Sequence, residues 1–315
     1  MIFYIYALIQ SLFIFVSLSA FSYPDFIGYG YTSCLTCHYN SQGGGPLSDY
    51  GRALFSELTA RTFISDRALD EDLAEESGFL GKQKIPYWLR PSFKLRTLWN
   101  QKNPGSKDTS EKIIPMQFDL GANFFWNEEM ESMVQLTMAR VSDAEALRRG
   151  GGVFQPKEYF FRSQIGEGWW YYIGLMDRVF GIRHVDHTSY QRSANGLTQY
   201  AQSHGFVIHK INESWELTLN SFFGNVSMPN QDQEHKGFSV LGEADVLEKV
   251  RVGGSFMTSR SEIQRKNTFA AHYKQGLDRG TSLMAEYGII QTAFEDNLTS
   301  TNGSYTFLQA QMFLA

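Results

Sequence analysis

The sequence predicts an all-β protein, an antiparallel transmembrane β-barrel of about twelve strands that follows a small helical segment. From residue 86 onward, segments of about ten residues alternate between apolar and polar side chains. The links between these segments alternate between long and short. After the N-terminal apolar stretch, no run approaches the roughly 18 apolar residues that a spanning helix requires. A helical membrane protein is therefore excluded.

Residues 1–22 are the first element and have the features of a signal peptide. An apolar run from Ile2 to Val16 is followed by small residues, and Ala20-Phe21-Ser22 is a small-x-small cleavage site. No Lys or Arg precedes the run, so a retained anchor is the alternative. Both interpretations predict export.

Residues 23–80 are predicted to be a haem c-binding segment. Cys34-Leu35-Thr36-Cys37-His38 contains the only two cysteines of the chain and has the Cys-x-x-Cys-His pattern of covalent haem attachment. In that pattern the two thiols bond to the porphyrin and the histidine binds the iron. We expect one haem c on Cys34 and Cys37, with His38 as the proximal axial ligand.

Other uses of the two cysteines have different requirements. A four-cysteine zinc site needs more thiols, and a thioredoxin-type redox pair needs a βαβ pattern that is absent around the motif. A disulfide between Cys34 and Cys37 would close a very short loop and stabilise the fold little. A redox or structural disulfide remains the alternative to haem c. Downstream, the sequence predicts helices over 48–61 and 66–76.

Residues 85–315 are predicted to form the barrel. In residues 116–126, for example, Phe118, Leu120 and Phe124 share one face, and Asp119 and Asn123 share the other. The predicted strands are 87–99, 116–126, 131–141, 157–166, 168–180, 199–210, 213–224, 236–246, 249–259, 265–275, 280–290 and 303–314. The number of strands would be higher if the natural chain continues beyond Ala315.

The lengths of the links distinguish a barrel from a soluble sandwich. Long links are predicted at 100–114, 142–156, 181–198, 225–235 and 291–302, with only the link at 260–264 shorter, and tight turns lie between them. Outer-membrane barrels have long external loops and short periplasmic turns, whereas a Greek-key sandwich does not sort its loops in this way. We therefore expect a protein of the outer membrane of a Gram-negative bacterium, with its haem segment facing the periplasm.

The polar face of the predicted strands carries charges of both signs, as an aqueous lumen allows. These residues are Arg90, Lys94, Arg96, Arg162, Arg178, Arg251, Lys274, Asp119, Glu158, Glu243, Asp245 and Glu286. The alternation predicts a mixed polar lumen without a clear preference for one ion.

The chain resembles the porin-like outer-membrane proteins of Gram-negative bacteria that carry an N-terminal monohaem cytochrome c segment. The resemblance rests on Cys34, Cys37 and His38, on Tyr50-Gly51-Arg52-Ala53-Leu54, and on the periodicity of the remaining two thirds. It implies electron transfer by one haem at the periplasmic mouth or in the lumen. The expected partners are periplasmic electron carriers or other cytochromes and outer-membrane lipid, and no nucleic acid.

The second axial ligand is missing near the motif, because residues between Tyr39 and Pro115 include neither His nor Met. The iron could be five-coordinate, could take a ligand from a partner, or could take one from the barrel wall. For the wall, the candidates are His272, which we expect beside Lys274 near the periplasmic mouth, then His209 and Met284.

Two rival functions remain open. One is a channel with a haem-bearing plug, and the other is a peroxidase-like haem enzyme with an open iron site. We favour an electron carrier over a catalyst and assign no catalytic residue. The pair His184 and His187 fits turn and loop hydrogen bonds in an external loop better than a metal site.

Overall fold

The computed structural model describes residues 23–54, 86–102, 110–129, 131–141, 153–183, 189–198, 200–225, 235–278, 281–295 and 299–311. The signal peptide, the acidic helix predicted at 66–76, and His184 and His187 lie outside the described residues. Residues 49–54 are helical, as predicted, and the rest of the helix predicted over 48–61 also lies outside them. None of the described helices is long and apolar enough to cross a bilayer.

Besides the helical residues 49–54, the described helices are α2 (Tyr23–Gly28), the 3-10 helix η1 (Cys34–Thr36) and α6 (Tyr190–Ala194). The strands are β1 (Leu89–Lys102), β2 (Ser110–Phe125), β3 (Ser132–Arg140), β4 (Phe154–Gly166), β5 (Trp169–Met176), β6 (Ser203–Ile211), β7 (Trp215–Phe223), β8 (Lys236–Leu247), β9 (Val250–Arg260), β10 (Gln264–Asp278), β11 (Thr281–Phe294) and β12 (Ser300–Gln311). The prediction of about twelve strands is confirmed.

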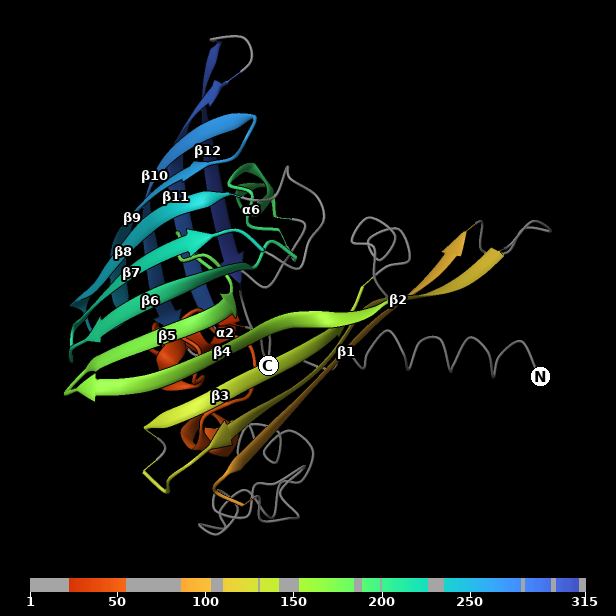
Figure 1. Cartoon of the computed structure of the whole chain (residues 1–315), viewed down its shortest axis with the longest axis vertical. Coiled ribbons are helices and arrows are strands. Elements are labelled where there is room, and N and C mark those ends of the chain that lie inside the picture. Colours follow the sequence, from red (N-terminus) through yellow and green to blue (C-terminus); the bar gives the residue numbers. More distant parts are fainter. Residues whose placement is uncertain are drawn as a thin grey trace.

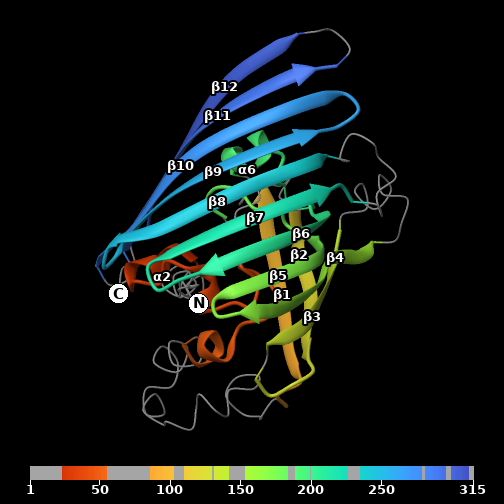
Figure 2. The same cartoon turned by 60° about the vertical axis from the view of Figure 1, so that its left-hand side comes forward.

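All twelve strands belong to one sheet, in which each strand pairs with the next along the chain (Figure 1). The described pairings run from β1 to β12, and none of them joins these two edge strands. Figure 2 shows that the sheet curves, with the N-terminal residues inside the curve. We call the inner side the concave face and the outer side the convex face.

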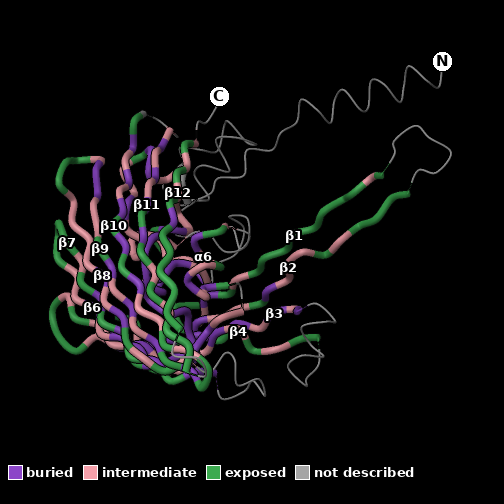
Figure 3. The backbone as a smooth tube through the Cα atoms, turned by 90° about the horizontal axis from the view of Figure 1, so that it is seen from above, coloured by how far each residue is buried: buried purple, intermediate pink, exposed green. Residues whose placement is uncertain are grey.

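The two faces of the sheet differ in chemistry, because successive side chains of a strand point to opposite sides. On β7, Thr218 and Asn220 are buried on the concave face, while Leu217 and Leu219 are exposed on the convex face. Figure 3 shows this alternation along the strands. Exposed large apolar residues of other strands include Phe93, Leu95, Trp99, Leu120, Leu136, Ile173, Phe206, Phe238, Phe269, Tyr287, Ile289 and Leu308. The sheet therefore buries polar side chains and exposes apolar ones.

The N-terminal residues 23–54 lie against the concave face at the end where the strands are joined by short turns. Ile27 packs with Met284 of β11, and Thr32 Oγ1 donates to Asp245 Oδ1 of β8 at 3.2 Å. Asp49 pairs with Arg90 of β1 at 2.7 Å. We call residues 23–54 the docked segment.

The prediction of an external loop at 181–198 is wrong for the described part of this link, which lies on the concave face. β5 ends at Met176, four residues before the predicted strand end, and the chain then turns onto the concave face. There the Val179 N–H donates to Asn220 Oδ1 at 3.3 Å and the Gly181 N–H donates to Ser255 Oγ at 3.1 Å. We call the described parts of this link, 177–183 and 189–198, the inner loop. Residues 177–180 are predicted to continue the strand, because their inward turn depends on hydrogen bonds to polar side chains of distant strands. The local sequence does not show these bonds.

Candidate functional site

The Cys34–His38 motif is folded as one tight turn. The N–H groups of Cys37 and His38 both donate to the Cys34 carbonyl, at 3.3 and 3.0 Å. This turn is the helix η1, and it brings the ends of the motif close together. Both cysteines are free thiols in the structure. The turn therefore presents two unbonded sulfurs and one imidazole from five consecutive residues.

Glycines keep the space beside this turn open. Gly43, Gly44 and Gly45 all have positive φ angles, which an L side chain rarely adopts. A Cβ atom at Gly43 would lie 3.5 Å from Cys34 Sγ. At Gly51 a Cβ atom would lie 2.3 Å from the Cys37 carbonyl oxygen, so the helix of residues 49–54 can approach the motif only because this residue is glycine.

The imidazole of His38 is in the form that can bind a metal. Burial, together with the nearby charges of Lys94 and Arg183, lowers the pKa of His38 to about 4, so the ring is neutral at pH 7. Its Nδ1 atom is buried and has no hydrogen-bond partner. A neutral imidazole is the usual metal-binding form of histidine. Burial also raises the pKa of both thiols, that of Cys37 to about 11.

Arg183 of the inner loop connects the motif with the sheet. It donates through Nη1 to the Gly43 carbonyl at 3.0 Å, and its Nη2 atom lies 2.6 Å from Asp177 Oδ2 and 3.6 Å from Glu158 Oε1. A pocket beside it is lined by Gly44, Gly45, Ser92, Lys94, Asp119, Thr137, Lys157, Glu158 and Arg183. Sequence reasoning missed this arginine, because nothing in the sequence indicates that its loop folds inward.

Aromatic contacts hold the other side of the docked segment. The Tyr39 ring lies 4.9 Å from the Phe125 ring, and the Arg162 guanidinium carbon lies 5.9 Å from the Tyr39 ring centre. The same guanidinium carbon lies 3.6 Å from the ring centre of Trp170. Such contacts each contribute about 0.5–2 kcal/mol. The predicted inward orientation of Arg162 is confirmed, since it is buried on the concave face.

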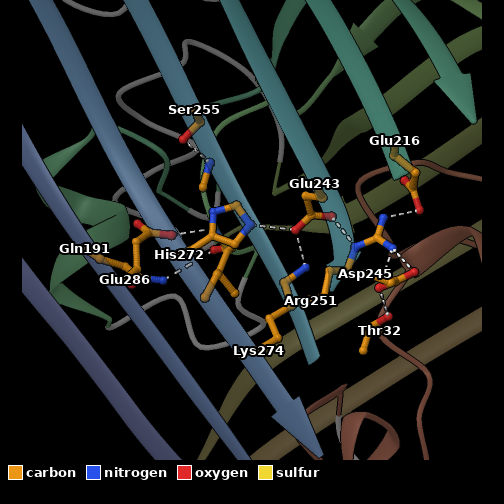
Figure 4. A network of polar contacts seen from close by, with 12 residues as sticks. Thr32, Gln191, Glu216, Glu243, Asp245, Arg251, Ser255, His272, Lys274 and Glu286 are labelled. Atoms are coloured by element: carbon orange, nitrogen blue, oxygen red, sulfur yellow. Dashed lines mark hydrogen bonds and ion pairs between the residues drawn. The ribbon is translucent and has the colours of Figure 1, made fainter. Parts of the chain in front are cut away.

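A network of charged side chains joins β7, β8, β9 and β10 on the concave face (Figure 4). Arg251 of β9 is its centre and lies 2.6 Å from Glu216, 3.2 Å from Glu243 and 3.0 Å from Asp245. Thr32 of the docked segment binds Asp245. The predicted mixed charge of this face is confirmed here, because Arg251 and Lys274 lie among three carboxylates.

The three candidate distal ligands all face the concave side. His272 lies beside Lys274, as predicted, and both bond to Glu243 Oε1, His272 through Nε2 at 2.6 Å. His209 Nε2 lies 3.1 Å from Glu216 Oε2, and Met284 is fully buried against Ile27. Their role as iron ligands stays a prediction. Among the described residues, no group of three or more His, Cys, Asp or Glu gathers as a metal site.

No protein-family model matches the chain, and no curated protein matches it. Among solved structures, it is similar to the trimer form of OmpT, an outer membrane protein of Vibrio cholerae, with 10% identity and a TM-score of 0.37 over 70% of this chain and 83% of that one. It is similar to OmpT expressed in the outer membrane of Vibrio cholerae, with 9% identity and a TM-score of 0.37 over 72% and 83% of the two chains. A likeness of this size indicates nothing of what this chain binds.

Proposed function

We propose that this chain is an outer-membrane β-barrel protein that takes part in electron transfer through one haem c. The haem is bonded to Cys34 and Cys37, and His38 is its proximal ligand. The docked segment holds it on the concave face, which becomes the lumen of the barrel. The observation that carries the proposal is that a Cys-x-x-Cys-His turn with two free thiols is docked against this face.

The convex face supports the membrane location. An antiparallel sheet with apolar side chains outside and polar ones inside suits lipid on one side and water on the other. A soluble sheet would cover these apolar residues, since large exposed apolar patches are rare in soluble monomers. The order β1 to β12 with antiparallel neighbours also has the connectivity of an up-and-down barrel.

The residues around the motif fit a haem. The Nδ1 atom of His38 is buried and unpartnered, the ring is neutral, and Gly43 places no side chain beside Cys34 Sγ. The haem supplies a reversible one-electron change at its iron. Cys34 and Cys37 fix its position, and His38 holds one side of the iron. Arg183 places a positive charge close to both His38 and Cys34.

The position of the docked segment suggests where electrons enter. It lies at the end of the sheet with the short turns, which in outer-membrane barrels faces the periplasm. Periplasmic electron carriers or other cytochromes are therefore the expected partners. One haem cannot cover a hydrocarbon layer of roughly 30 Å, so a second carrier must complete the path.

The test is expression of the full chain in a Gram-negative host with haem c maturation, followed by isolation of the outer membrane. We expect a heat-modifiable band with a covalent haem c spectrum, and loss of that haem in Cys34→Ser and Cys37→Ser with the band retained. A heat-modifiable band without haem in the unsubstituted protein would contradict electron transfer. It would leave a channel with a docked plug, which ion conductance would then measure.

A further inference from the structure

A second cluster of basic side chains lies on the concave face, at the end away from the Cys34–His38 turn. It consists of Arg178 of the inner loop, Lys266 of β10, and His235 just before β8, and we call it the basic cluster. The sheet register sets Gly237, Ser259 and Lys266 in one row across β8, β9 and β10. His235 precedes Gly237 by two residues and so belongs to the same face.

The two cations converge on the end of α6. Arg178 donates through Nη2 to the Gly196 carbonyl, and Lys266 donates through Nζ to the Ala194 carbonyl, two residues earlier. The Arg178 guanidinium carbon also lies 5.5 Å from the ring centre of Phe222. Carbonyl oxygens and an aromatic ring therefore hold both side chains in place without neutralising their charge.

Among the described residues, no ion pair is formed by Arg178 or Lys266. Asp177 is the carboxylate that acts on Arg178, but it is already engaged by Arg183 at 2.6 Å, by Arg192 at 3.8 Å and by Gln202 at 2.7 Å. Arg178 is only 8% exposed. An unpaired buried charge costs several kcal/mol, so this cluster has a strong demand for an anion.

Buried donor atoms of the cluster also lack partners. Arg178 Nε and His235 Nδ1 are both buried without a hydrogen bond. Burial and the charges of Arg178 and Lys266 lower the pKa of His235 to about 4, so its neutral ring can donate one hydrogen bond at pH 7.

We propose that the basic cluster is a binding site for an inorganic oxyanion such as phosphate or sulfate. A tetrahedral oxyanion presents several acceptors, which match the planar donor fork of Arg178 and the ammonium group of Lys266. His235, just before β8, donates to the same anion. The site lies at the end of the sheet with the long links, so in the proposed barrel an anion reaches it from outside the cell.

The test is equilibrium dialysis of the full detergent-solubilised chain with radiolabelled inorganic phosphate at fixed ionic strength. We expect one phosphate per chain, and about tenfold weaker binding or more in Arg178→Gln and in Lys266→Gln, because each loses a hydrogen bond between charged groups. Lys266→Arg should retain binding. Lys210→Gln is the matched control, since it removes one lysine charge at the opposite end of the sheet.

Equal phosphate binding in the unsubstituted protein, Arg178→Gln and Lys266→Gln would overturn the proposal, as would the absence of saturable binding. If Arg178→Gln does not fold, Lys266→Gln decides the outcome. Lys266 makes one hydrogen bond near the rim of the sheet, so its replacement should leave the fold intact. The measurement is repeated in the Cys34→Ser and Cys37→Ser protein. The oxyanion site does not depend on haem, so phosphate binding should be retained in this haem-free protein. Failure of the haem proposal and failure of the oxyanion proposal can therefore be distinguished.

Discussion

Asp49 is the residue whose charge fixes one end of the docked segment. Its carboxylate accepts from Arg90 Nε at 2.7 Å and from Nη2 at 2.9 Å, and Arg90 is only 4% exposed. Asp49→Asn removes the negative charge that pairs with this guanidinium, so we expect docking to weaken by about 1–3 kcal/mol. Trypsin cleavage within residues 23–54 under native conditions measures this. The control is Tyr29→Phe, at an exposed residue of the same segment, and equal cleavage of both variants would contradict the prediction.

The same pair predicts a dependence on pH. Burial raises the pKa of Asp49, but hydrogen bonds and charge from Arg90 and Arg52 outweigh it, and the net pKa is below the usual range. A carboxylate with a lowered pKa stabilises docking above its ordinary pKa of about 4 and loses that contribution as the pH falls. Protection from an acid-active protease should therefore decline below about pH 4 in the unsubstituted chain and change less in Asp49→Asn.

His272 is the first candidate for the distal ligand, and His209 is the second. Each has a buried, unpartnered Nδ1 atom, and their Nε2 atoms are held by Glu243 and Glu216. If His272 binds the iron, His272→Ala should convert a low-spin haem spectrum to a high-spin one, while His209→Ala should not. A low-spin spectrum in both variants would direct the search to Met284 or to a partner. A high-spin spectrum in the unsubstituted protein would favour an open iron site.

At the scale of elements, close contact between α2 and β10 positions the docked segment. A Cβ atom at Gly276 would lie 2.3 Å from the Ile27 carbonyl oxygen, so Gly276→Ala must displace α2 or β10. We expect faster proteolysis of the docked segment and, in a bilayer, a larger ion conductance. Gly303→Ala is the control, because a Cβ atom there meets nothing within 4 Å. Equal conductance of both variants would show that the segment does not obstruct the lumen.

At the scale of the whole molecule, the convex face decides whether the sheet lies in lipid. Leu219 is 43% exposed near the middle of β7. A lysine at the bilayer midplane of a barrel costs about 2–4 kcal/mol, so Leu219→Lys should reduce the heat-modifiable outer-membrane form. Glu213→Lys, in the turn before β7, should have little effect. A Leu219→Lys protein that assembles fully would argue for a soluble sheet.

The sequence by itself determined the twelve strands, their alternating faces and the Cys-x-x-Cys-His pattern at Cys34–His38, because each depends on local periodicity or spacing. Tertiary structure alone decided that residues 177–183 turn inward and that Arg183 reaches Gly43. The hydrogen bonds of the inner loop come from Asn220, Ser255 and other residues far along the chain, and such pairings leave no periodic signal. The basic cluster depends on the same inward fold. Local patterns therefore specified the wall of the structure, while long-range polar contacts specified what lies inside it.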